Sequence, residues 1–178
     1  MTFRPAFLLA LGLPALLLLM SGCQPATGSS PSAAAPPRAD ATVAAPPAPS
    51  PTLPPMVVHK SASCGCCGTW VEHVRAAGFE VEVRDTDDMG PVKERLGIAP
   101  RMLSCHTAEV GGYFVEGHVP AEDIKRLLAE KPAVKGLALP GMPMGSPGME
   151  SPDGRVQPYV VSAVDADGRM SDYAHHGH

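Results

Sequence analysis

The alternation of apolar and polar residues predicts a series of short strands after position 55. Residues 79–83 alternate apolar and charged side chains with period two, which is typical of a strand with one buried face. The pair Gly111-Gly112 lies between two short apolar runs and suits a tight hairpin turn. A second hairpin is expected to turn at 165–168. The predicted strands are residues 56–60, 79–83, 108–110, 113–115, 159–164 and 168–172.

Apolar residues at helical spacing predict helices between these strands. One helix is expected over about 66–77, where Gly78 can end it. Another begins at Val119-Pro120, because proline is well suited to the first position of a helix, and it ends before Pro132.

A shorter helix is predicted after the acidic segment 85–88. We interpret the three aspartates of this segment as helix caps rather than as a hard-metal or acid–base site. The core side of the helix is expected to carry Met89, Val92 and Leu96, and Gly97 is expected to end it.

The predicted order is strand, helix, strand, helix, strand, strand, helix, followed by the second hairpin. Cysteines follow the first strand, and this combination is typical of a thioredoxin-like α/β fold. Residues 56–178 are long enough for one core but hardly for two. We therefore predict a single thioredoxin-like domain over residues 56–178, with a C-terminal Met-rich loop and a β-hairpin extension.

The first 55 residues predict export and attachment to a membrane. Residues 1–22 have the layout of a secretory signal peptide, and the small residues before Cys23 resemble the lipobox of bacterial lipoproteins. We expect Cys23 to be acylated, so that the protein is lipid-anchored in the bacterial cell envelope and faces the periplasm. A retained membrane-spanning anchor is the alternative, although Pro14 interrupts the apolar run. Residues 23–55, rich in Ala and Pro, predict a disordered tether.

Charge and motifs exclude several classes of function. The formal net charge is −4 and the basic residues are scattered, so the sequence predicts no nucleic-acid partner. It also contains neither a glycine-rich phosphate loop nor a nucleophilic serine motif.

Three cysteines lie together where the first strand gives way to a helix. Cys64 and Cys67 have the C-x-x-C spacing that lets two thiols share one metal or form one disulfide. The positive end of the helix dipole is expected to lower the pKa values of these thiols. Cys66 is an unusual addition, because adjacent helical residues diverge by about 100°. A single mononuclear centre would therefore use Cys66 and Cys67 awkwardly.

A second cluster, Cys105-His106, precedes a predicted strand. Strand alternation would direct one of these side chains toward the first cluster and the other away, and we expect Cys105 to be the inward one. Thiolates from two loops can bridge several copper(I) ions, each of which needs only two or three soft ligands. We therefore predict a polynuclear copper(I) site. The alternative is two structural disulfides, which are natural in an exported domain.

Further candidate ligands lie later in the chain. His118 and His106 can add borderline nitrogen ligands to the sulfur atoms. The thioethers of Met142, Met144 and Met149 also suit copper(I), although methionine is equally an ordinary core residue. The His-rich tail 173–178 can capture a divalent ion or can simply fray.

Four motifs in the same order resemble the CopG-like periplasmic copper-resistance proteins, and the likeness runs from about Val57 to the end. The motifs are Cys64-Gly65-Cys66-Cys67-Gly68, Ser104-Cys105-His106-Thr107-Ala108, Glu116-Gly117-His118-Val119-Pro120 and Pro140-Gly141-Met142-Pro143. The resemblance implies a thioredoxin-like protein that binds copper and acts beside copper-efflux or copper-oxidase components of the cell envelope.

Carried over residue by residue, the resemblance implies Cys64, Cys66, Cys67 and Cys105 as the copper ligands, with His106 and His118 less surely involved. It leaves open whether the protein stores copper, delivers it or changes its oxidation state. An alternative of another class is a thiol–disulfide oxidoreductase of the cell envelope, in which two of the cysteines cycle without metal. A third is a binding module whose cysteines are all paired.

Overall fold

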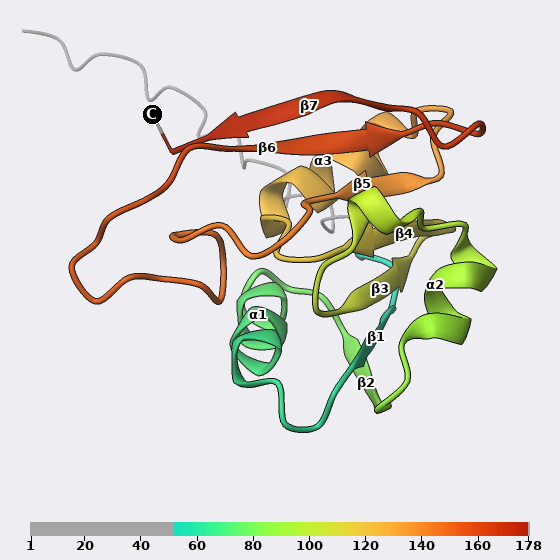
Figure 1. Cartoon of the computed structure of the whole chain (residues 1–178). Coiled ribbons are helices and arrows are strands. Elements are labelled where there is room, and N and C mark those ends of the chain that lie inside the picture. The colour runs from blue at the N-terminus through green and yellow to red at the C-terminus, as the bar shows by residue number, and fades with distance from the viewer. Residues whose placement is uncertain (1–51, 178) are drawn as a thin grey trace, which may run out of the picture. The chain divides into compact units, whose positions relative to one another are not determined.

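Seven strands form one mixed sheet in the computed structural model, which describes residues 52–177 (Figure 1). The strands are β1 (Met56–Lys60), β2 (Val81–Asp85), β3 (Thr107–Val110), β4 (Tyr113–Glu116), β5 (Gly136–Ala138), β6 (Tyr159–Val164) and β7 (Met170–His176). The helices are α1 (Gly65–Ala76), α2 (Gly90–Leu96) and α3 (Ala121–Glu130), with one 3-10 turn, η1 (Pro100–Met102).

The strand order in the sheet is β2-β1-β3-β4-β5-β6-β7. Two pairs are parallel, β1 with β2 and β4 with β5, and they are connected through α1 and α3 respectively. The other neighbouring pairs are antiparallel. The predicted α/β class and the C-terminal hairpin are therefore confirmed.

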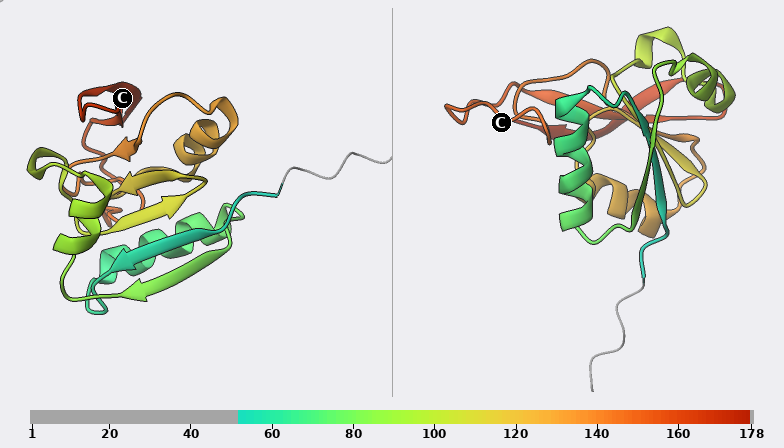
Figure 2. Two further views of the ribbon diagram at one scale, coloured as in Figure 1. Left: turned by 90° about the vertical axis from the view of Figure 1, so that its right-hand side faces the viewer. Right: turned by 90° about the horizontal axis from the view of Figure 1, so that it is seen from below.

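The two faces of the sheet bury separate apolar clusters. On β4, Val115 belongs to the larger cluster, which includes Trp70 of α1 and Ile124 of α3. Its neighbour Phe114 points the other way and packs with Met102 of η1 in the smaller cluster. The helices α1 and α3 thus cover one face and the α2–η1 segment covers the other (Figure 2). The cysteine-bearing end of α1 is held rigidly because α1 packs through this core.

The glycine pair 111–112 makes the predicted hairpin turn between β3 and β4. Gly111 and Gly112 have φ of 57° and 86°, and residues with side chains rarely adopt two successive positive φ angles. Three strand predictions needed correction. Strand β7 runs over Met170–His176 rather than 168–172. Strand β2 begins at Val81, two residues later than predicted, although Phe79 is buried as expected. The three-residue strand β5 was missed.

The core side of α2 differs from the prediction. Met89, Val92 and Leu96 are only half-buried, whereas the buried residue of the helix is Lys93. The reason is that Lys93 has an internal partner, the fully buried carboxylate of Glu116. The acidic segment before α2 does act as predicted at one position, since Asp88 Oδ1 accepts a hydrogen bond from the N–H of Gly90 at 2.9 Å.

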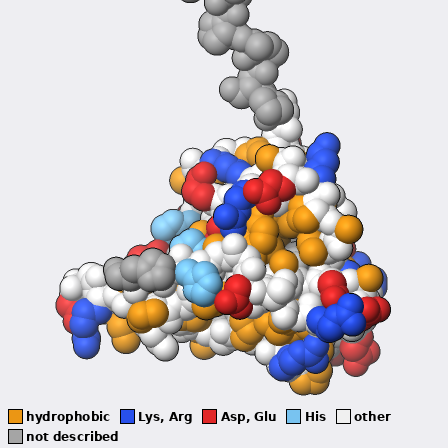
Figure 3. Space-filling view, turned by 90° about the horizontal axis from the view of Figure 1, so that it is seen from above, with side chains coloured by type: hydrophobic (Ala, Val, Ile, Leu, Met, Phe, Trp, Pro, Cys, Tyr) orange, Lys and Arg blue, Asp and Glu red, His pale blue; other side chains and the backbone are white. Residues whose placement is uncertain are grey.

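The C-terminal tail continues β7 as far as His176. His176 Nε2 lies 2.7 Å from Asp123 Oδ2 of α3, and its ring stacks on Tyr159 with centroids 4.9 Å apart. Histidine side chains gather on the face seen in Figure 3. This part of the tail is thus ordered on the sheet rather than frayed.

The predicted signal peptide 1–22, the lipidated Cys23 and most of the tether 23–55 lie outside the described residues. Of the tether, Leu53 packs against the larger apolar cluster. Among residues 52–177, no helix is long and apolar enough to cross a membrane.

Candidate metal centre

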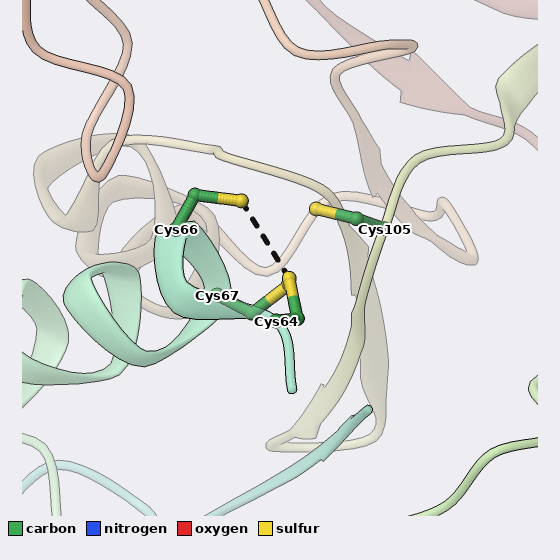
Figure 4. A group of neighbouring side chains, drawn as sticks. All are labelled: Cys64, Cys66, Cys67 and Cys105. Atoms are coloured by element: carbon green, nitrogen blue, oxygen red, sulfur yellow. Dashed lines mark hydrogen bonds between the residues drawn. A yellow bond between two sulfur atoms is a disulfide. The ribbon is translucent and has the colours of Figure 1, made fainter. Parts of the chain in front are cut away.

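The first sulfur-bearing segment is the junction of the β1–α1 loop with α1. Cys64 is the N-cap residue of α1, and its N–H donates to Ser61 O at 3.1 Å. One helical turn brings Cys64 and Cys67 together, and the structure joins them in a disulfide. Cys66 takes no part in that bond, although its sulfur lies only 3.5 Å from Cys64 Sγ (Figure 4).

The second sulfur-bearing segment is the loop between η1 and β3. It brings Cys105 to face Cys66 across the gap between this loop and α1 (Figure 4). The sulfur atoms of Cys64, Cys66, Cys67 and Cys105 all lie within 4.8 Å of one another. Cys66 and Cys105 are free thiols, so the alternative of two disulfides does not describe this structure. The predicted inward position of Cys105 is confirmed.

Strand alternation predicts that His106 points away from the site, and this prediction was wrong. Its Nδ1 lies 3.5 Å from Cys105 Sγ, because both residues precede β3 and the period of a strand does not apply to them. The ring is fully buried, between Trp70 at 4.4 Å and His118 at 4.8 Å between centroids. Burial, and then the neighbouring charges of His118 and Lys93, lower the pKa of His106 to about 3. The imidazole is therefore neutral.

One buried nitrogen of this histidine has no partner. Within residues 52–177, His106 Nε2 is the buried side-chain polar atom that makes no hydrogen bond. Leaving such a group unsatisfied costs about 1–3 kcal/mol. The nitrogen of this ring that faces Cys105 is Nδ1, and a neutral imidazole nitrogen is a suitable metal ligand.

His118 lies on the other side of Cys105, and its tautomer follows from its contacts. Its Nδ1–H donates to Pro147 O at 2.8 Å, which leaves Nε2 free of a proton and 3.0 Å from Cys105 Sγ. Metal-ligating histidines commonly donate their second N–H to a carbonyl in this way. Cys105, His106 and His118 form a second group whose ligand atoms lie within 4.8 Å of one another. The six predicted Cys and His residues are thus brought together around Cys105.

The protonation of Cys105 follows from its surroundings. Burial, and then the charge of Cys66, raise the pKa of the Cys105 thiol to about 11. The thiol therefore keeps its proton at neutral pH and can donate S–H to His118 Nε2. A soft metal that binds here must displace that proton. The lowered pKa values expected for thiols at the start of α1 stay a prediction.

The loop 141–150 packs over the first turn of α1. Gly148 comes so close that a Cβ there would lie 2.6 Å from Cys66 O and 2.9 Å from Trp70 N. Glu150 Oε1 also lies 2.7 Å from His73 Nε2 of α1. The loop therefore covers the helix turn that carries the cysteines.

The three predicted methionine ligands lie on this same loop. Met142 and Met144 are 51% and 40% exposed, so their side chains are at the surface rather than among the buried nitrogen and sulfur atoms. Met149 is half-buried.

Sequence reasoning missed the residues that support the centre. Trp70 packs on His106 and donates its indole N–H to Val119 O at 2.9 Å, but in the sequence it looks only like a core residue. Pro147 and Gly148 gave no signal beyond a proline- and glycine-rich loop. The burial of Lys93 could have been inferred from its place one helical turn after Met89, which the sequence assigns to the core side of α2.

A cluster of thiols and neutral imidazoles on a mixed α/β scaffold defines a protein with a site able to bind a soft metal. A search of curated proteins found no significant match. Residues 102–149 match the family model described as a protein of unknown function, DUF411.

Two solved structures are similar over most of the described region. One, described as copper resistance protein CopG form 1, is 45% identical, with a TM-score of 0.66, and the match covers 71% of this chain and 99% of that one. The other, form 2 of the same protein, is 46% identical with a TM-score of 0.66, and the match covers 70% and 98%. The chain belongs to the CopG copper resistance protein family.

Proposed function

We propose that this protein binds copper(I) outside the cytoplasm and contributes to copper resistance. The observation that carries the proposal is the convergence of four cysteine sulfur atoms within 4.8 Å of one another. Membership in a family whose solved members are described as copper resistance proteins supports copper as the metal. Copper is the cargo of this site.

The ligand set follows from the donors. Cys64, Cys66, Cys67 and Cys105 supply thiolates, and four thiolates at this spacing suit several cuprous ions better than one tetrahedral zinc ion. His106 and His118 would add neutral nitrogens beside Cys105. The thioethers of Met142, Met144 and Met149 in the 141–150 loop would serve as an auxiliary contact for incoming copper.

Copper binding by all four sulfur atoms requires reduction of the Cys64–Cys67 disulfide. A thiol reductant supplies the two electrons: two reductant thiols become one disulfide, and Cys64 and Cys67 become thiols. Each thiol then loses its proton to the solvent when copper binds.

The cellular setting is proposed from the sequence. We place the protein in the bacterial cell envelope, anchored through acylated Cys23 and facing the periplasm, where it would pass copper to efflux or oxidase components. The element order, with three cysteines at the start of α1 after β1, also supports a thioredoxin-like fold.

The test is an anaerobic titration of the reduced protein with copper(I) against a chromophoric cuprous chelator. More than one ion should bind per chain, and tight binding should be lost in the Cys64→Ser/Cys67→Ser variant. Cys23→Ser is the matched control, because it removes a cysteine that is remote in sequence from both clusters. Copper K-edge absorption should show short copper–copper and copper–sulfur distances. Absence of tight binding by the reduced wild-type protein would refute the proposal.

A second candidate is thiol–disulfide exchange, favoured by the disulfide at the start of α1. Reduction of insulin that persists in the presence of a copper chelator, and that is lost in Cys64→Ser, would support this function instead.

A further inference from the structure

Within the described part of the chain, the loop that carries Cys105 has backbone–backbone hydrogen bonds at its two ends but none at Ser104 or Cys105. Leu103 O accepts from the N–H of Gly141 and His106 O accepts from the N–H of Gly117, each at 3.0 Å. The loop lies between the end of η1 at Met102 and the start of β3 at Thr107, and it has no regular structure. Cys105 must nevertheless be placed to within a fraction of an ångström for its sulfur to meet the sulfurs of α1. Between these two ends, the side-chain contacts made to the backbone of Ser104 therefore help to set the position of Cys105.

Glu116, the last residue of β4, holds this loop through hydrogen bonds to its side-chain carboxylate. Its Oε1 accepts a hydrogen bond from the N–H of Ser104 at 2.6 Å, and its Oε2 accepts one from Thr107 Oγ1 at 2.6 Å. The side chain of Glu116 is fully buried. The carboxylate thus binds the residue directly before Cys105 and the residue two positions after it.

Lys93 of α2 completes the arrangement. Its ammonium group donates to Glu116 Oε1, to Ser104 O at 3.2 Å and to Thr107 Oγ1 at 3.1 Å. Lys93 is 8% exposed. Both backbone polar groups of Ser104 are therefore bound by one buried ion pair, and two different elements of the fold fix the orientation of the Cys105 backbone.

Stability alone is a poor explanation for this pair. The desolvation of two buried charges largely offsets their attraction, so well-packed apolar residues often stabilise a fold as well or better. Apolar residues cannot provide directional bonds to Ser104. We propose that Glu116 and Lys93 are positioning residues that act through Ser104 to hold the Cys105 thiol among the other three sulfur atoms.

The first test needs no metal. In a Cys23→Ser/Cys64→Ser/Cys67→Ser background, Cys66 and Cys105 are the remaining thiols. Oxidised glutathione is added, and formation of the Cys66–Cys105 disulfide is followed by alkylation and mass spectrometry. The rate should fall at least about tenfold when Lys93→Met/Glu116→Leu is introduced, because a small misplacement strongly reduces reactivity.

A matched control uses the other ion pair between α2 and the β3–β4 hairpin. Arg95→Met/Glu109→Leu removes the pair of Arg95 and Glu109, which touches neither Ser104 nor Cys105. Its rate should equal that of the parent. Glu116→Gln keeps an oxygen for the N–H of Ser104 and should give an intermediate rate. Circular dichroism shows whether each variant folds, and Glu116→Gln replaces the double variant in the test if the double variant is unfolded.

The second test rests on the proposed function. In the otherwise wild-type chain, Lys93→Met/Glu116→Leu should weaken copper(I) binding about 10–100-fold, as loss of an orienting group does at other metal centres. Copper K-edge absorption should show fewer sulfur neighbours per copper. A variant that is only less stable, but still folded, would keep the same number of sulfur neighbours.

Equal disulfide rates in the folded variants and the parent would overturn the positioning role, and so would unchanged copper affinity and sulfur coordination. If the wild-type protein does not bind copper(I) but the disulfide rates differ as expected, the proposed function fails and the positioning role stands.

Discussion

The two ends of the β3–β4 hairpin carry similar charges in opposite environments. At the turn end, Glu109 receives two hydrogen bonds from Arg95, at 2.7 and 2.9 Å, and its side chain is 32% exposed. At the open end, Glu116 pairs with Lys93 and is fully buried. Both cations come from α2, two residues apart. The same two elements thus build a solvated ion pair and a buried one.

The environment reverses the protonation behaviour of the two carboxylates. Hydrogen bonding to Arg95 outweighs partial burial and lowers the pKa of Glu109 to about 2. Burial raises the pKa of Glu116 in spite of the Lys93 charge. A surface pair contributes little to stability, whereas a buried pair whose partner is removed is strongly destabilising. The comparison teaches that burial and directional hydrogen bonds are used at the open end, where the loop that carries Cys105 must be held in position.

The largest contrast is expected when each cation is removed. Lys93→Met leaves a buried carboxylate without its partner and should lower the free energy of unfolding by about 4 kcal/mol. Arg95→Met leaves Glu109 partly exposed and still in contact with His59, and should lower the free energy of unfolding by less than about 1 kcal/mol. Urea denaturation at pH 7 measures both. Similar losses in the two variants would show that burial does not distinguish the pairs.

A smaller contrast is expected between two glycines of the hairpin. At the open end, Gly117 has φ of 80°, and a Cβ there would lie 2.5 Å from Leu139 O and 2.6 Å from Ser104 Cβ. Gly117→Ala should therefore cost about 3 kcal/mol, through strain and displacement of the Ser104 loop.

At the turn end, a Cβ on Gly112 would meet nothing within 4 Å, although φ is 86°. Gly112→Ala should cost only the strain of the left-handed conformation, about 1 kcal/mol. Thermal unfolding of both variants measures the difference, and a larger effect at Gly112 would contradict the comparison.

Acid should act first at the open end, through His106. Its pKa in the folded state, about 3, lies below the ordinary value of 6.5, so the folded state favours the neutral ring. The associated stability is present above about pH 6.5 and is lost as the pH falls toward 3. Between pH 8 and pH 5 the loss should be about 2 kcal/mol.

Urea denaturation across this range should show the loss in the wild-type protein and a reduced loss in His106→Gln. The reduction will be partial, because burial also lowers the pKa of His118. An unchanged pH profile in His106→Gln would mean that His106 is not the group responsible.

The smallest effect is expected at the turn end in stronger acid. Because the folded pKa of Glu109 lies below its ordinary value of 4.5, its stabilising contribution is present above pH 4.5 and is lost as the pH falls toward 2. Glu109→Gln should slightly lower the melting temperature at pH 7 and lower it less at pH 3. A difference that stays constant over this range would contradict the ion-pair explanation.

The parts of the fold that depend on local pattern were predictable from the sequence. The glycine pair at 111–112 defined the first hairpin, and the turn at 165–168 defined the second. Strand β5 is only three residues long and lacks any such pattern, so it becomes a strand through its neighbours β4 and β6. The burial of Lys93 was not predicted, because its partner Glu116 is 23 positions away in the chain.

The site was predictable in its chemistry but not in its support. Residue type and spacing identified the cysteines, and the facing position of Cys105 followed from a strand argument that fails for His106. The orientation of His118 depends on Pro147 O, 29 residues later in a loop without a periodic pattern. Such a contact arises from tertiary packing, which a local pattern does not encode.

The close approach of Gly148 to the first turn of α1 has a consequence for protein engineering. A graft of the CGCC segment and its helix into a foreign scaffold would transfer three of the four thiols, without Cys105, the two histidines or the Pro147 carbonyl that sets the His118 tautomer. A transplantable module must therefore include the loop 141–150 and, because Val161 and Ala163 of β6 belong to the larger apolar cluster, the strands that follow it.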